Sequence, residues 1–186
     1  MLAIDRLENL KGVPLKLLGL ERFLDKRPEY AGKIVLLQVG ISAFERKDDY
    51  LCTKKEVLRL QRKINSKYPG TMVFQEFGEN QLSEERRLGY LKAADIAIVT
   101  SVRDGLNRLP LEYCVAHQGI LEQDYKDEAR PLNVIPGMCI LSEFASCARV
   151  MRGSIHINPW KIPEIAYAIE CCLNMDKEEH RRRMRY

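Results

Sequence analysis

Short apolar runs alternate along this chain with longer amphipathic stretches, and this alternation limits the possible folds more than any other feature. Residues 34–39 are almost continuously apolar, as is typical of a strand buried on both faces of a parallel sheet. The pattern predicts the α/β class: a doubly wound parallel sheet with helices on both faces, which binds ligands at the carboxyl ends of its strands. Further strands are predicted at 71–77, 96–100, 139–144 and 155–159, and helices at 14–24, 56–68, 84–94, 105–117 and 162–173.

With 186 residues, 46% of them hydrophobic, the chain is long enough for a sizeable core, and we expect residues 1–186 to form a single domain. Basic residues exceed acidic ones by 30 to 26 with both signs interspersed, so this mild excess does not indicate a nucleic-acid partner. No apolar run approaches the roughly 18 residues that span a bilayer. Residues 1–5 lack the basic and apolar regions of an export signal. We therefore expect a soluble, cytoplasmic protein with no membrane partner.

The cysteines and histidines do not indicate a disulfide framework or a metal centre. None of the six cysteines belongs to a C-x-x-C pair, and the adjacent Cys171 and Cys172 lie in a helical pattern that points their side chains apart. The three histidines are far apart in sequence and lack ligand spacing. Reduced thiols and no metal are therefore the prediction.

Two polar stretches are interpreted as surface structure. Residues 118–137, which carry Pro131 and Pro136, are predicted to be a surface insertion, and the simplest interpretation is a loop with no role of its own. The arginine-rich run 180–186 follows a helical context. We interpret it as a solvated helix end, whose cations favour the C-terminal dipole, and not as a nucleic-acid arm.

Two short segments carry the side chains that best suit a ligand. Residues 6–12 offer Arg6 and Lys11, two cations about one helical turn apart, and Asp104 and Asn107 follow the apolar run 96–100. A helix N-terminus with nearby cations attracts phosphate, and a carboxylate and an amide suit the hydroxyls of a sugar. Together the segments predict a site for a diphosphate that carries a sugar. Solvated surface cations remain the alternative for Arg6 and Lys11, and simple helix capping remains the alternative for Asp104.

Two further positions are secondary candidates. Glu112 lies one helical turn beyond Arg108, and this spacing allows either a surface ion pair with Arg108 or a contact with a ribose hydroxyl. Residues 142–144 end a predicted strand and could line a cleft.

Six motifs occur in order at 6–14, 35–38, 94–95 with 99–107, 112–113, 141–145 and 157–160. Together they closely resemble the trehalose-6-phosphate synthase family. The resemblance covers nearly the whole chain but only the C-terminal half of the family's enzymes. That half is a Rossmann-like domain, which holds the nucleotide-sugar donor in a two-domain glycosyltransferase of the GT-B type. The resemblance thus implies that the N-terminal, acceptor-binding half is absent here.

The resemblance also implies a reaction. The family transfers glucose from UDP-glucose to glucose 6-phosphate with retention, needs no metal or other cofactor, and is not expected to use a protein nucleophile. This chain alone is then expected to bind UDP or UDP-glucose without completing transfer, since glucose 6-phosphate would bind only with the N-terminal half.

Site roles follow from the resemblance residue by residue. Arg6 and Lys11 would hold the donor diphosphate, and Asp104 would contact hydroxyls of the glucose. Glu112 would bind the ribose, and Leu82 would lie beside the uracil. Backbone amides at the start of the next helix would line the glucose and phosphate site: those of Gly105, Leu106, Asn107, Arg108 and Leu109.

Departures from the family pattern keep two other functions open. A charged Arg108 stands where an apolar residue is common, and Glu8 stands where the family has aspartate. With the insertion at 118–137, these departures suggest a non-catalytic, regulatory synthase-like module as one alternative. A related glucosyltransferase with another acceptor is the second alternative, because acceptor choice resides mainly in the other half.

Overall fold

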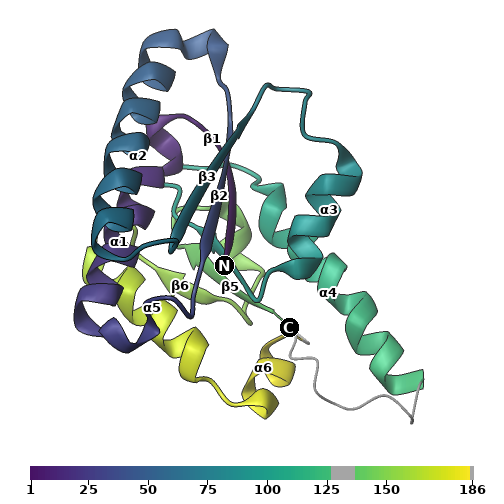
Figure 1. Cartoon of the computed structure of the whole chain (residues 1–186). Coiled ribbons are helices and arrows are strands. Elements are labelled where there is room, and N and C mark those ends of the chain that lie inside the picture. The colour runs from purple at the N-terminus through teal and green to yellow at the C-terminus, as the bar shows by residue number, and fades with distance from the viewer. Residues whose placement is uncertain (127–136, 185–186) are drawn as a thin grey trace.

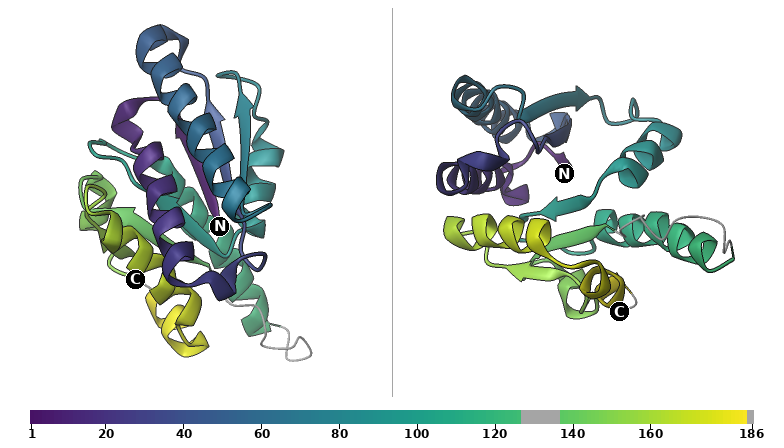
Figure 2. Two further views of the ribbon diagram at one scale, coloured as in Figure 1. Left: turned by 60° about the vertical axis from the view of Figure 1, so that its left-hand side comes forward. Right: turned by 60° about the horizontal axis from the view of Figure 1, so that its bottom comes forward.

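The computed structural model describes residues 1–126 and 137–184, and its centre is a six-stranded, wholly parallel sheet in the order β3-β2-β1-β4-β5-β6. Figure 1 shows α1, α2 and α5 on one side of this sheet and α3 and α4 on the other, and the right-hand view of Figure 2 shows the same layers end on. The predicted α/β fold is therefore confirmed. The strands are β1 Leu2–Arg6, β2 Leu36–Ile41, β3 Met72–Phe77, β4 Ile96–Val99, β5 Met138–Ser142 and β6 Ile155–Ile157.

Strand β1 lies in the middle of the sheet, although the five strands predicted from the sequence did not include it. Its first four residues are buried and its last, Arg6, is partly exposed. The charged Asp5 and Arg6 interrupt its apolar run after Ile4, so the apolar pattern missed this strand. From β1 the chain winds outward through β2 and β3 and returns to β4 on the other side of β1. The carboxyl edge between β1 and β4 is therefore the topological switch point, where such sheets bind ligands.

Most helix predictions are confirmed, with shifted ends. The structure has α1 Val13–Lys26, α3 Glu84–Ala93 and α5 Ile162–Asn174, and Ser83 caps α3 as its spacing suggests, accepting a hydrogen bond from the Arg86 amide. Helix α2 spans Lys47–Lys67 and begins well before residue 56, because Asp48 and Asp49 in its first turn favour the helix N-terminus.

Helix α4, Arg108–Lys126, differs from its prediction at both ends. It begins three residues after Gly105, because the Asn107 side chain accepts a hydrogen bond from the Leu109 amide and so caps the helix. At its other end it continues into the segment predicted as a surface insertion. Residues 127–136, the rest of that segment, lie outside the described residues. Within the described ranges, none of the helices is long and apolar enough to cross a bilayer.

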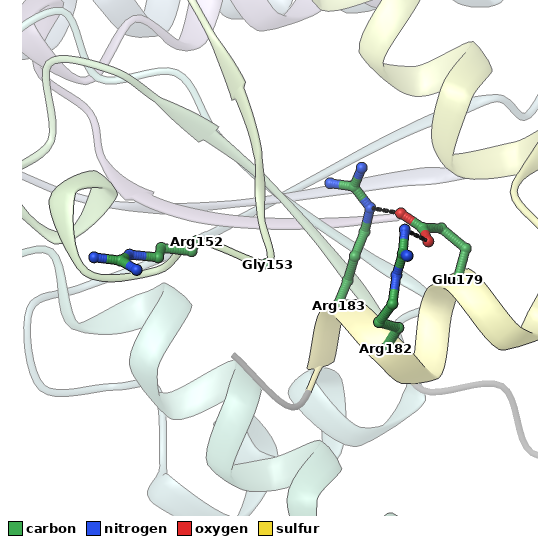
Figure 3. A pocket seen from close by; sticks show the side chains of 5 residues that line it. All are labelled: Arg152, Gly153, Glu179, Arg182 and Arg183. Atoms are coloured by element: carbon green, nitrogen blue, oxygen red, sulfur yellow. Dashed lines mark hydrogen bonds and ion pairs between the residues drawn. The ribbon is translucent and has the colours of Figure 1, made fainter.

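Residues 180–184 of the arginine-rich terminal run belong to the short helix α6, Lys177–Met184, and residues 185–186 lie outside the described residues. Arg183 Nε lies 2.7 Å from Glu179 Oε1, and Arg182 also pairs with Glu179. With Arg152 and Gly153 these side chains line a pocket of about 340 Å³ (Figure 3). Because 152–153 lead into the amino end of β6, this pocket lies at the opposite edge of the sheet from the switch point. The pairing within the helix agrees with a solvated helix end.

A fully buried charged pair fixes α1 to the centre of the sheet. Lys16 Nζ of α1 lies 2.6 Å from Asp5 Oδ2 of β1, and both side chains are 0% exposed. Gln38 of β2 joins the pair, since its Oε1 accepts from Lys16 at 3.1 Å and its Nε2 donates to Asp5 at 3.0 Å. Burial lowers the pKa of Lys16, and the neighbouring Asp5 carboxylate counteracts part of that effect. The pair thus binds β1, β2 and α1 together one residue before Arg6.

We predict that Lys16→Met destabilises the protein by about 3–5 kcal/mol, because it leaves the Asp5 carboxylate charged, buried and without its cation. The double variant Lys16→Met with Asp5→Asn removes both charges and should recover much of that loss. Urea unfolding followed by far-ultraviolet circular dichroism measures both free energies. A double variant as unstable as the single one would show that side-chain packing, and not charge, explains the loss.

Candidate functional site

The loops that follow β1 and β4 meet at the switch point. The Val102 amide donates to the Leu10 carbonyl at 2.9 Å, and the Thr100 hydroxyl donates to the Gly12 carbonyl at 3.0 Å. These bonds join segments about ninety positions apart in the sequence and bring together two of the regions predicted to carry the site.

Gly12 makes this meeting possible. Its φ is +62°, in the left-handed region that favours glycine, and it forms the turn that starts α1. A Cβ atom at this position would lie 2.1 Å from the Thr100 carbonyl oxygen, far inside van der Waals contact. Only a residue without a side chain therefore allows the first loop to pack against the second.

Lys11 and Asp104 meet directly across this junction. Lys11 Nζ lies 2.9 Å from Asp104 Oδ2, and both side chains are partly buried. The same carboxylate oxygen accepts hydrogen bonds from Ser101 Oγ at 3.0 Å and Asn107 Nδ2 at 2.9 Å. Three donors thus fix Asp104, and Lys11 is not a freely solvated cation. Asp104 does not cap α4, because Asn107 does so.

A pocket of about 450 Å³ opens beside Asp104 at the carboxyl ends of β4 and β5. Its walls include Glu143 and Phe144, so part of the segment 142–144 lines a cleft as the sequence suggested. Arg103 and Arg149 also line it. No sequence pattern indicated a role for either arginine, and Arg149 lies in a short 3-10 helix, Ser146–Arg149, that no periodicity indicated.

Arg6 ends β1 at the same edge of the sheet, but its guanidinium is engaged by three carboxylates. Its Nε lies 2.9 Å from Glu8, its Nη1 2.9 Å from Glu79 and its Nη2 3.3 Å from Glu45. Burial alone would lower the pKa of Arg6, but these carboxylates outweigh it and raise the pKa, so the group stays cationic. The sequence did not indicate Glu45, which lies in a short 3-10 helix after β2, or Glu79, which lies in the loop after β3.

The backbone between Asp104 and α4 is held by the loop after β5. The Gly105 carbonyl accepts from Ser146 Oγ at 2.6 Å and from the Ser146 amide at 3.3 Å. Among the described residues the amides of Gly105 and Leu106 have no hydrogen-bond acceptor, whereas the Asn107 amide donates to the Cys147 sulfur and the Leu109 amide donates to the Asn107 side chain. Of the amides expected to line a ligand, Leu109 could reach one only if Asn107 released it. Arg108 begins α4.

Glu112 faces a different opening, a groove of about 620 Å³ between α3 and α4. Its Oε1 pairs with Arg108 at 3.1 Å, as the spacing allowed, and its Oε2 lies 2.5 Å from Arg87 of α3. The sequence gave no sign of Arg87, because that contact depends on how two helices pack. Leu82 precedes α3 and packs, partly buried, against the core on this face of the sheet. The candidate residues therefore share one edge of the sheet but not one pocket.

Within the described ranges, no group of three or more His, Cys, Asp or Glu side chains is arranged to hold a metal ion. The side chains at this edge are instead cations, carboxylates and amides. Such a set suits an anion that also carries hydroxyl groups.

The fold and this edge define a class of protein: a doubly wound α/β domain with paired charges at its switch point. The family model for glycosyltransferase family 20 matches residues 1–186, and the chain belongs to this family.

Known relatives agree with this assignment. An alpha,alpha-trehalose-phosphate synthase [UDP-forming] from Aspergillus fumigatus is 33% identical over 185 residues, which are 98% of this chain and 35% of the relative. The solved structure of the trehalose-6-phosphate synthase OtsA has a TM-score of 0.83 at 26% identity, covering 99% of this chain and 38% of that one. A second solved structure, described as trehalose-6-phosphate from E. coli bound with UDP-2-fluoro glucose, has the same TM-score, identity and coverage.

The N-terminal domain of a Candida albicans trehalose-6-phosphate phosphatase is also similar, with a TM-score of 0.80 at 30% identity, covering 99% of this chain and 36% of that one. This chain therefore spans little more than a third of the length of each of these relatives.

We predict that Gly12→Ala destabilises the protein by more than the about 1–2 kcal/mol that a left-handed conformation costs alanine. The added methyl group would also collide with the Thr100 carbonyl. Gly32→Ala is the matched control, because Gly32 has φ +76° and open space around its Cβ position. Thermal unfolding compares the two variants. Equal losses would contradict the idea that the contact between the loops depends on Gly12.

Proposed function

We propose that residues 1–186 form the donor-binding domain of a trehalose-6-phosphate synthase, a glycosyltransferase that moves glucose from UDP-glucose to glucose 6-phosphate with retention. The observation that carries this proposal is the 2.9 Å contact between Lys11 and Asp104. It joins a cation and a carboxylate from two loops at the switch point of a family 20 fold, beside the start of α4.

The proposed ligand separates Lys11 from Asp104 and binds to both side chains. A phosphate of the donor takes the Lys11 ammonium, and a glucose hydroxyl donates to the Asp104 carboxylate. The amides of Gly105, Leu106, Asn107 and Arg108, near the positive end of the α4 dipole, add donors for phosphate and sugar oxygens. Ser101 and Asn107 keep the carboxylate oriented while Lys11 is exchanged.

The charges also suit the chemistry. When the bond between glucose and UDP breaks, negative charge builds on the departing diphosphate. Lys11, Arg6 and the α4 dipole then stabilise the transition state more than the ground state. Neither a metal nor another cofactor has a part in this proposal. The acceptor would bind between this domain and the N-terminal half of the enzyme.

At the nucleoside end we propose that Glu112 accepts hydrogen bonds from the ribose hydroxyls and that Leu82 lies beside the uracil. Arg87 and Arg108 support this role, because both hold the Glu112 carboxylate in place. The similar E. coli structure, which is bound with UDP-2-fluoro glucose, supports a UDP-sugar as the donor. Because nucleotide sugars of this kind are cytoplasmic metabolites, we propose a cytoplasmic location.

We predict that UDP binds the chain and that Arg6→Ala or Lys11→Ala weakens binding about 10- to 100-fold, the usual effect of losing a charge-assisted hydrogen bond. Isothermal titration calorimetry measures the affinities. Arg59→Ala is the control, because Arg59 is an exposed cation of α2 paired with Glu56. If the wild-type chain gives neither heat nor a shift in melting temperature with UDP or UDP-glucose, the donor-binding proposal is wrong.

A second candidate function is favoured by one comparison. A domain 30% identical to this chain is the N-terminal domain of a trehalose-6-phosphate phosphatase and not of a protein named as a synthase. The chain could then belong to a regulatory, non-catalytic module, and Arg108 in place of an apolar residue agrees with this alternative. A third candidate, a glucosyltransferase with another acceptor, would keep the same donor residues.

We predict that the full-length parent protein, supplied with UDP-glucose and glucose 6-phosphate, forms trehalose 6-phosphate. Mass spectrometry of the product and coupled detection of released UDP provide the measurement. The variant Asp104→Asn in that parent should lower the rate while the protein stays folded. A folded parent that binds UDP but forms no product would favour the regulatory module. Turnover only with other acceptors would favour the third candidate.

A further inference from the structure

The guanidinium of Arg6 presents a different nitrogen to each of three carboxylates. Its Nε bonds to Glu8, its Nη1 to Glu79 and its Nη2 to Glu45. The partners come from three places in the chain: Glu8 from the loop after β1, Glu45 from the short 3-10 helix after β2, and Glu79 from the loop after β3. All of them gather at the carboxyl edge of neighbouring strands.

These carboxylates differ in how firmly they are held. The Glu8 side chain is only 13% exposed, so the surrounding protein holds it in place beside Arg6. The Glu45 and Glu79 side chains are 75% and 52% exposed. Exposed ion pairs are weak and readily exchanged. Glu45 and Glu79 can therefore leave Arg6 at little cost, whereas Glu8 stays.

The geometry of the Arg6 guanidinium makes the two exposed glutamates compete with a ligand for the same nitrogen atoms. With Nε held by Glu8, a phosphate that binds Arg6 through two parallel hydrogen bonds approaches the terminal nitrogens Nη1 and Nη2. Glu79 and Glu45 occupy these nitrogens. A bound diphosphate would replace both carboxylates and then lie near them as a charge of the same sign.

This inference rests on the proposed donor-binding function. We propose that Glu45 and Glu79 are affinity-setting and specificity-determining residues, which compete with the ligand diphosphate for the terminal nitrogens of Arg6. They thereby disfavour the more highly charged of two related ligands. A nucleoside diphosphate carries about one more negative charge at neutral pH than the corresponding nucleotide sugar. Glu45 and Glu79 would then favour exchange of the product UDP for the donor.

The test compares the wild-type chain with the double variant Glu45→Gln with Glu79→Gln, by titration with UDP and with UDP-glucose at low salt. We expect the double variant to bind UDP about tenfold more tightly and UDP-glucose only about threefold more tightly. It loses two exposed ion pairs that compete for Arg6 and also two carboxylates that repel the diphosphate, and this repulsion is stronger for UDP, which carries the larger negative charge. Added salt should reduce both gains.

Two further variants show whether the position of the charge matters. Glu56→Gln removes an exposed carboxylate that pairs with Arg59 on α2, and it should change neither affinity. Glu8→Ala should instead weaken UDP binding, because it removes the acceptor that orients the Arg6 guanidinium through Nε. Circular dichroism confirms that each variant is folded.

The outcomes separate this inference from the function on which it rests. If the wild type binds UDP and the double variant binds it no more tightly than Glu56→Gln does, competition by Glu45 and Glu79 is wrong and donor binding stands. Equal gains for UDP and UDP-glucose would overturn the proposed discrimination by charge. If neither the wild type nor any variant binds either ligand, the donor-binding proposal is wrong, and this inference is wrong with it.

Discussion

The close approach of Gly12 to the Thr100 carbonyl is the constraint on which the site depends. Through it the loop after β1 packs against the loop after β4, and Lys11 comes within 2.9 Å of Asp104. The buried pair Lys16 and Asp5 provides the second anchor, since it fixes the start of α1 to the sheet just behind this junction. A rigid edge of this kind can hold a cation and a carboxylate side by side without relying on flexible side chains.

Each charged side chain proposed to contact the donor has an opposite charge of the chain as its neighbour. Lys11 pairs with Asp104, Arg6 with three glutamates, and Glu112 with two arginines. Separating a partly buried pair leaves two charges to be satisfied, so a ligand that replaces one partner alone binds poorly. A sugar diphosphate carries both an anion for the ammonium and a hydroxyl for the carboxylate. On the proposed function, this explains why one molecule with both groups would suit the edge better than phosphate or sugar alone.

The sequence allowed prediction of those features that depend on local patterns. Apolar runs located five of the six strands, and the polar residues after the run 96–100 pointed to Asp104. Features that depend on long-range packing could not be predicted. The charged Asp5 and Arg6 interrupt the apolar run of strand β1, yet this strand fills the centre of the sheet. Glu45 and Glu79 reach Arg6 only because β2 and β3 end at the same edge, and Arg87 reaches Glu112 only because α3 packs against α4.

Arg108 is the departure that most favours a regulatory parent, and its surroundings reduce its weight. Its side chain is 78% exposed, and its pair with Glu112 joins positions one turn apart on a helix surface, a contact that contributes about 0–1 kcal/mol. Arg87 holds the other carboxylate oxygen at 2.5 Å from a less exposed position, so the orientation of Glu112 does not depend on Arg108. An exposed arginine can also turn away from an incoming ribose while its amide stays at the start of α4. The difference between a catalytic and a regulatory parent therefore cannot rest on Arg108, and it depends instead on whether the complete protein turns over both substrates.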